Sequence, residues 1–153
     1  MNSSESNQNT KQILSKNLKF NAKKIELIEE FVKDVLIYNN KYNLISKSSE
    51  KKIWKRHVLD SAQLIKLLDH KSFNSLADLG TGAGFPGILL SIFYSDILTF
   101  HVKLYEKSRV KVNFLRGILK KLRLTNTYIY DNDYQSHIID SDYIICRAFK
   151  KLP

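Results

Sequence analysis

A glycine-rich segment over residues 76–87 holds the residue types with the clearest chemical use in this chain. Its sequence is Leu-Ala-Asp-Leu-Gly-Thr-Gly-Ala-Gly-Phe-Pro-Gly, which includes four of the five glycines and one of the two prolines. Glycine permits a positive φ and lets a ligand approach bare backbone. Pro86 suits the first turn of a helix because its φ is already fixed, and the apolar run from Ile88 onwards supplies a buried helix side. A strand end, a glycine turn and a helix start together predict a cradle for a nucleotide-like cofactor.

Two kinds of cofactor fit the spacing of these glycines. Gly82, Gly84 and Gly87 match the dinucleotide pattern G-x-G-x-x-G, which is a weak signal by itself. Asp78 and Gly80 extend the pattern to D-x-G-x-G-x-G. This longer pattern is typical of methyltransferases that use S-adenosylmethionine (SAM), in which the acidic residue lies near the amino-acid end of SAM.

A second acidic residue strengthens the prediction of a cofactor. Glu106 follows Gly87 by 19 residues and ends the apolar stretch 100–105. A carboxylate at the end of a second strand can accept both ribose hydroxyls, in NAD and in SAM alike. A tight turn without a ligand is the simpler alternative, but the order of strand, glycines, helix start and second acid favours a cofactor. Asp78 and the lack of a hydride-transfer partner favour SAM, and an NAD-type protein is the weaker alternative.

The remaining residues favour catalysis by alignment of the reactants over acid–base or covalent catalysis. Guanine N7 carries a lone pair and no proton, so its methylation needs proximity and no general base. Cys146 is the single cysteine and lies in an apolar run, which favours a core position over a nucleophile. Residues 146–149 lack the N/D-P-P-Y loop of exocyclic amino methyltransferases. The four histidines are scattered, so we expect no metal site.

The composition predicts one folded domain with a polyanionic partner. The 153 residues are 43% hydrophobic, and the formal net charge is +10, which favours nucleic acid, although lysine-rich AT-biased coding would give the same charge. Part of this charge lies on the helix expected near residues 108–122 and on its flanks. This basic face is either part of an RNA-binding surface or a face exposed to solvent. Its residues are Lys107, Arg109, Lys111, Arg116, Lys120, Lys121 and Arg123. A single cysteine and the lack of a membrane-length apolar run predict a cytoplasmic protein without a membrane partner, and we expect a monomer.

The predicted elements that position these residues alternate as in a parallel α/β protein. We expect residues 1–20 to be disordered or frayed, and residues 21–153 to form one domain. Helices over 21–40 and 49–68, the second with Ser48 as a possible N-cap, would form a helical extension over 21–70. Strands are predicted at 75–79, 99–105, 128–130 and 143–146, and helices at 86–94 and 108–122. This order predicts a doubly wound, mostly parallel, Rossmann-like sheet core over 74–153.

Four segments carry a resemblance to a known family. They are Tyr-Asn-Leu-Ile-Ser at 42–46, Arg-His-Val-Leu-Asp-Ser at 56–61, the glycine turn with its proline at 80–87, and Arg-Ala-Phe at 147–149. In combination and order they closely resemble the RsmG family, also called GidB, of bacterial small-subunit ribosomal RNA guanine-N7 methyltransferases. The resemblance covers residues 21–152. It implies SAM as the cofactor, transfer of a methyl group to N7 of a guanine, and 16S ribosomal RNA or the small ribosomal subunit as the partner.

Together with the glycine pattern, the resemblance implies two sets of site residues. The set expected at the cofactor is Asp78, Gly80, Gly82, Gly84, Phe85, Glu106, Tyr134, Gln135 and Arg147. The set expected to matter for activity is Asn43, His57 and Arg147. Tyr134 and Gln135 match a pair that lies beside the adenine in the family, and Arg147, at the end of the last predicted strand, matches an arginine at the site.

The chain departs from the family pattern at two places. Asp133 stands where the family usually has a basic residue before the pair at the adenine. The family also continues past Leu152 with further strands, so we expect the sheet to be incomplete. A truncated remnant that binds SAM or RNA without catalysis is therefore an open alternative to an active enzyme.

Overall fold

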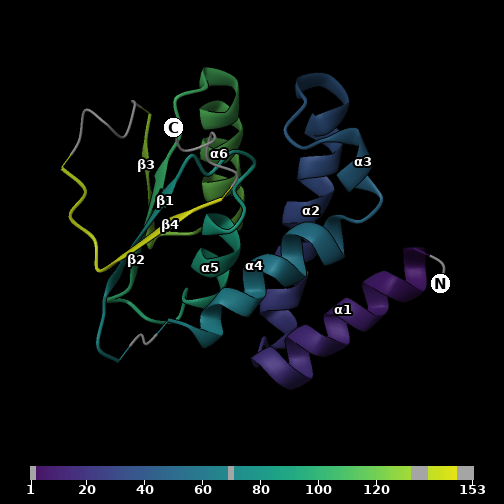
Figure 1. Cartoon of the computed structure of the whole chain (residues 1–153), viewed down its shortest axis with the longest axis horizontal. Helices are drawn as coiled ribbons and strands as arrows, with labels where there is room; N and C mark the ends of the chain where they lie inside the picture. Colours follow the sequence, from purple (N-terminus) through teal and green to yellow (C-terminus); the bar gives the residue numbers. More distant parts are fainter. Residues whose placement is uncertain (1–2, 69–70, 132–137, 148–153) are drawn as a thin grey trace, which may run out of the picture.

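In the described part of the chain, four parallel strands form one sheet, which lies along one side of the molecule with helices in layers behind it (Figure 1). The computed structural model describes residues 3–68, 71–131 and 138–147. The strands are β1 Ser75–Leu79, β2 His101–Tyr105, β3 Thr127–Tyr130 and β4 Tyr143–Cys146. Their order is β3-β2-β1-β4 with every neighbouring pair parallel. The sheet thus extends from β1 in both directions, with β2 and β3 on one side and β4 on the other, which confirms the predicted Rossmann-like order.

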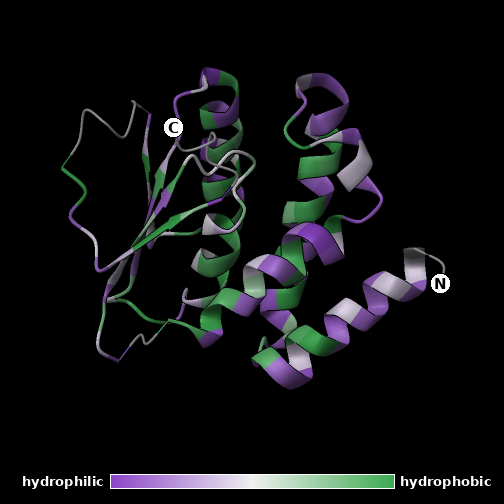
Figure 2. Ribbon diagram, viewed as in Figure 1, coloured by the Kyte–Doolittle hydropathy of each residue, from purple (hydrophilic) through white to green (hydrophobic). Residues whose placement is uncertain are grey.

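Two helices cover one face of this sheet and belong to its parallel crossovers. They are α5 Gly87–Phe93, between β1 and β2, and α6 Arg109–Leu122, between β2 and β3. The α5 residues from 87 to 92 are all buried, and Figure 2 shows this helix in the hydrophobic colour along most of its length. Helix α6 is amphipathic, with Phe114, Leu115 and Ile118 buried on one side. The predicted helices at 86–94 and 108–122 are therefore confirmed.

Helix α2, Ala22–Tyr42, forms the next layer and packs on α5 and α6. It begins where Asn21 accepts a hydrogen bond from the backbone N–H of Lys24 at 2.9 Å, a standard N-cap. Its buried residues Ile28, Phe31, Val32 and Val35 recur at helical spacing, so one stripe faces the core. This confirms the helix predicted at 21–40.

The expectation that residues 1–20 are disordered or frayed is wrong for the described part of this segment. Helix α1 runs over Ser3–Leu18, and Thr10, Leu14 and Leu18 on one side of it are buried. These three residues are spaced four apart, so they form a narrow stripe that packs on α2 and the following helical segments. Lys11 pairs with Glu29 on α2. The average composition of this segment is polar, so it does not reveal a buried stripe of only three residues.

The single helix predicted at 49–68 is broken into four short pieces. They are α3 Lys47–Glu50, a π-helix η1 Trp54–Leu59, α4 Asp60–Ala62 and a 3-10 helix η2 Gln63–Lys66. The N-cap of α3 is Ser46 and not Ser48. Trp54, Val58 and Ala62 are buried at four-residue steps, a spacing that suits a turn wider than 3.6 residues. Such π turns occur frequently at functional sites.

The opposite face of the sheet has its own small apolar cluster. Ala77, Leu79 and Tyr105 are buried there, and the ring of Tyr105 stacks on that of Tyr130 with centroids 4.7 Å apart. Within the described ranges no helix covers this face. None of the described helices has the length and apolarity needed to cross a bilayer.

Candidate functional site

The glycine turn lies where β1 ends, at the carboxyl edge of the sheet. Gly80, Gly82 and Gly84 have φ values of +69°, +62° and +99°, which is the region where glycine is favoured because it has no side chain. The backbone N–H groups of Gly80 and Thr81 both donate to the carbonyl oxygen of Tyr105, at 2.9 and 3.1 Å. The turn is therefore attached to the end of β2, as the order of the motifs predicts.

Asp78 is buried beneath this turn and connects it to the start of α5. Its Oδ2 accepts hydrogen bonds from the Thr81 hydroxyl at 2.6 Å and from the Gly87 N–H at 2.8 Å. Its Oδ1 is buried without a partner among the described residues. Burial raises the pKa of Asp78 to about 6, although the hydrogen bonds from Thr81 and Gly87 and the charge of Arg147 act in the opposite direction.

Asp78 is expected to make the folded chain less stable as the pH rises from 4 to 7. Its pKa rises from an ordinary value of 3.8 to about 6 on folding. The stability it contributes is therefore fully present below pH 3.8 and is lost as the pH rises through 6. Two pKa units correspond to about 3 kcal/mol. Asp78→Asn keeps an acceptor oxygen and cannot ionise, so denaturant unfolding at pH 5 and pH 7.5 should show a smaller difference for this variant. Equal differences in both proteins would refute the assignment.

Glu106 lies directly beside the glycine turn. Its Oε2 accepts the Gly82 N–H at 3.0 Å, and its Oε1 accepts the Ser108 N–H at 2.8 Å. The side chain is mostly buried, at the point where β2 ends. Each carboxylate oxygen has a second lone pair that can accept a ligand hydroxyl. The predicted second acid is thus brought to the predicted turn.

Phe85 connects the turn to the N-terminal helices. This residue is 5% exposed, and its ring centroid lies 4.8 Å from that of Phe31 on α2 and 5.1 Å from that of His57 on η1. The helical extension therefore forms one wall of the glycine turn, which spacing alone does not reveal.

Arg147 joins the end of β4 to η1. Its Nη2 donates to the carbonyl oxygen of Arg56 at 2.9 Å and to Nδ1 of His57 at 2.8 Å. Its Nη1 makes a longer contact of 3.4 Å with the Ser61 hydroxyl oxygen. Two residues predicted separately, His57 and Arg147, are thus in direct contact at the carboxyl edge.

His57 is neutral at physiological pH in this environment. Burial, followed by the charge of Arg147, lowers its pKa to about 4. Because Nδ1 accepts a hydrogen bond from Arg147, the ring proton is on Nε2, which is buried without a partner in the described part of the chain. A neutral imidazole in this position orients the arginine and is not an acid that releases protons near pH 7.

Of the other predicted site residues, one lies at the end of α2 and two lie outside the described residues. Asn43 is exposed and ends α2 with φ +48°, a left-handed position that asparagine tolerates well. Tyr134 and Gln135, with the neighbouring Asp133, lie outside the described residues.

Sequence reasoning missed two residues that support the site. Asn39 is buried, donates to Glu50 Oε1 at 2.5 Å and accepts the Ile45 N–H at 2.8 Å, and thereby fixes the segment that leads into α3. Ser61 contacts Arg147. Each could have been recognised from helical spacing, since Asn39 follows the buried Val35 by four positions and Ser61 follows His57 by four.

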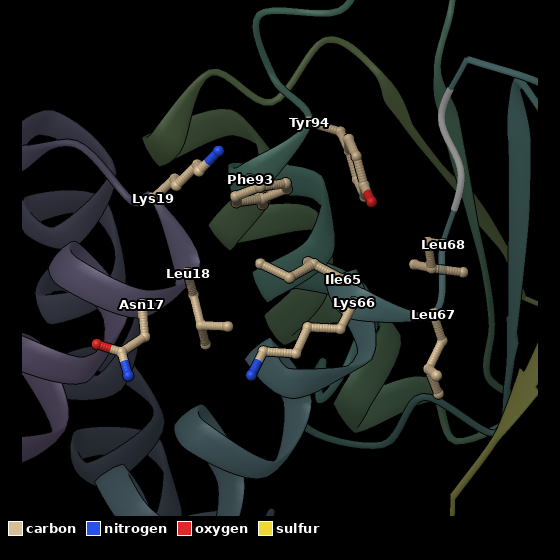
Figure 3. Close-up of a pocket in the computed structure, with 9 residues that line it drawn as sticks. All are labelled: Asn17, Leu18, Lys19, Ile65, Lys66, Leu67, Leu68, Phe93 and Tyr94. Carbon is tan, nitrogen blue, oxygen red and sulfur yellow. The ribbon is translucent and has the colours of Figure 1, made fainter.

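An open pocket of about 470 Å³ lies away from this cluster (Figure 3). The end of α1, η2 and the end of α5 line it, with Leu18, Ile65 and Phe93 among the lining residues. Because α5 starts at the glycine turn and runs away from it, this pocket lies at the far end of α5 from the site. No group of His, Cys, Asp and Glu in the described ranges could hold a metal ion.

The sequence is similar to proteins of one family throughout most of its length. The family model GidB, described as rRNA small subunit methyltransferase G, matches residues 24–153. The "Ribosomal RNA small subunit methyltransferase G" of Pelagibacter ubique is 42% identical over 118 residues, which is 75% of this chain and 55% of the relative. The protein of the same name from Magnetococcus marinus is 40% identical over 109 residues, covering 71% and 48%. The chain spans about half the length of these curated relatives.

Another relative and one solved structure are also similar to the chain. The protein of the same name from Rickettsia akari is 39% identical over 128 residues, covering 84% of this chain and 64% of the relative. Among solved structures, coclaurine N-methyltransferase bound to N-methylheliamine and SAH has a TM-score of 0.45 and 15% identity, and the match covers 95% of this chain and 51% of that one. This last similarity is too low to bear on function.

Proposed function

Because this chain belongs to the rRNA small subunit methyltransferase G family, we propose that it binds SAM and methylates N7 of a guanine in small-subunit ribosomal RNA. The observation that carries the proposal is the family match over residues 24–153, which includes the glycine turn, Glu106 and Arg147. A cytoplasmic location and a monomeric state are part of the same proposal.

The residues at the carboxyl edge fit SAM. Three positive-φ glycines leave bare backbone at the turn, and a Cβ built on Gly82 would meet only the Gly80 carbonyl oxygen, at 3.9 Å. Glu106 offers carboxylate lone pairs for ribose hydroxyls, and Asp78 has one oxygen without a described partner. In this proposal the turn and Glu106 hold the adenosine part, and Asp78 acts toward the amino-acid end.

The chemistry that the protein must supply is alignment. When bound, SAM provides an electrophilic methyl group, and guanine N7 has a free lone pair, so no side chain needs to remove a proton. The neutral state of His57 agrees with this requirement. Arg147 uses three of its five guanidinium N–H groups in the described contacts. The others are available for a ligand oxygen, so we assign Arg147 to orient the reactants.

The decisive test is transfer of a labelled methyl group from SAM to small-subunit ribosomal RNA by this 153-residue chain. Digestion of the RNA and mass spectrometry of the nucleosides should then show 7-methylguanosine. Tight SAM binding without transfer would support the alternative of a non-catalytic remnant. Binding of NAD in preference to SAM would favour the dinucleotide-binding alternative.

Gly80→Val is expected to weaken SAM binding by about tenfold or more. Gly80 is exposed with φ +69°, so a β-branched side chain would be strained there and would occupy the side from which a ligand approaches. Isothermal titration calorimetry measures the affinity, and the melting temperature shows whether the variant is folded. A folded variant with unchanged SAM affinity would place the cofactor elsewhere.

A further inference from the structure

A basic surface follows α3 on the N-terminal extension. Lys51, Lys52 and Lys55 are exposed, and none of them has an ion-pair partner within the described ranges. We call these three residues the basic arm. Glu50, which directly precedes the arm, is held by Asn39 and Lys47, so its charge is already partly matched.

The basic arm is connected to the candidate site through the backbone. Lys51 and Lys52 precede η1, and Lys55 lies within it. The Arg56 carbonyl oxygen and the His57 ring of the same helix accept hydrogen bonds from Arg147. Figure 1 shows α3 beside the upper end of α2, and Figure 2 shows hydrophilic colour on the turn that follows it. The arm therefore lies within a few residues of the two groups that hold Arg147.

The basic residues toward the end of α6 are less suited to the reaction site. Lys121 pairs with Asp34, and Arg116 pairs with Asp131, so part of their charge is neutralised. Helix α6 begins after β2 at the carboxyl edge and extends for 14 residues, which is about 20 Å at 1.5 Å per residue. Its last turn thus lies far from the carboxyl edge, where β2 and β4 end.

We propose that the basic arm is the docking surface for the phosphate backbone of the RNA substrate. This proposal rests on the proposed function and adds the surface on which the RNA binds. Exposed lysines without protein partners gain the most from phosphate, because binding releases the counterions of the RNA. Contacts of this kind set position without reading bases, so the arm fixes the RNA while the carboxyl edge receives the guanine.

The test compares two triple variants that remove the same charge. Lys51→Gln, Lys52→Gln and Lys55→Gln remove the arm. The control carries Lys16→Gln, Lys33→Gln and Lys120→Gln, three lysines that are also exposed and without a described ion pair. The probe is a transcribed fragment of small-subunit ribosomal RNA, titrated at several salt concentrations. SAM affinity and melting temperature are measured on every protein.

The arm variant should bind the RNA about tenfold more weakly at moderate salt, with unchanged SAM affinity. The slope of log affinity against log salt should fall by about 2, because each phosphate contact contributes ~0.7–0.9. The control should lose less than about threefold. Equal losses in the two variants would overturn the arm, since they would show a diffuse effect of net charge. If the parent binds or methylates the RNA and the arm variant does so equally well, the basic arm is not the docking surface, and the proposed function is unaffected. A parent that binds SAM but no RNA would overturn the proposed substrate as well.

Discussion

Gly84→Ala is expected to lower the free energy of unfolding by about 3 kcal/mol or more. A Cβ at this position would lie 2.6 Å from Ile88 Cγ1, 3.1 Å from Leu115 Cδ2 and 3.2 Å from Phe31 Cζ. Overpacking of this kind costs about 1–3 kcal/mol. The φ of +99° adds backbone strain of about 1–3 kcal/mol for a residue with a side chain. Because the same contacts hold the glycine turn against α2 and α6, SAM binding should weaken together with stability.

Gly117→Ala is the matched control for this prediction. Gly117 lies inside α6, and a Cβ there would meet no atom within 4 Å. Alanine is favoured over glycine in a helix by about 1 kcal/mol, so this variant should be more stable than the parent. Denaturant unfolding monitored by circular dichroism measures both. If Gly84→Ala is as stable as the parent, the turn is not packed as closely as described above.

Arg147→Lys is expected to reduce methyl transfer by about a hundredfold while the protein still folds. The guanidinium bridges the Arg56 carbonyl oxygen and the His57 ring through one nitrogen and also reaches Ser61. The single ammonium group of lysine cannot reproduce this planar arrangement. The lost hydrogen bonds should cost about 1–2 kcal/mol of stability, which is less than the cost of overpacking and strain expected for Gly84→Ala.

Two measurements on the same variant separate a functional from a structural Arg147. Transfer activity and SAM affinity report the site, and the melting temperature reports stability. The control is Arg123→Lys, the same substitution at an exposed arginine that ends α6, and it should behave like the parent. A lower melting temperature with unchanged binding and transfer would remove Arg147 from the site and leave it a purely structural link.

The sheet could be predicted from the sequence because its strands carry strong local signals. Strands β1 and β4 were expected at 75–79 and 143–146, and the structure has them over Ser75–Leu79 and Tyr143–Cys146. Strand β1 lies inside the sheet and is buried over most of its length, as a continuous apolar run predicts. Strand β4 lies at the edge of the described sheet and alternates between half-buried and exposed residues, so the expected core position of Cys146 is wrong. The glycine turn and Glu106 were predictable for a similar reason, since each is located by its distance from a strand end.

The N-terminal extension was harder to predict, because tertiary contacts decide its form. Helix α1 has a polar average composition, and it is stabilised by Leu14 and Leu18 docking on neighbouring helices. In the π-helix η1 the residues Trp54 and Val58 are buried, and a spacing of four does not distinguish a π turn from an ordinary helix. The contact between His57 and Arg147 joins two chain segments whose proximity only the folded structure defines.

The hydrogen bonds of Arg147 also bear on the stage of folding at which the site forms. They connect residues that are 91, 90 and 86 positions apart in the chain, whereas β1 and β2 pair across a much shorter interval, with Ser75 opposite His101. Contacts with large sequence separation carry the highest loop-closure entropy, so they form late in folding. We therefore expect the contact of η1 with the end of β4 to form later than the pairing of β1 with β2. Interactions that form after the transition state affect mainly the unfolding rate, so we expect the loss of this contact to shorten the lifetime of the completed site more than it slows folding.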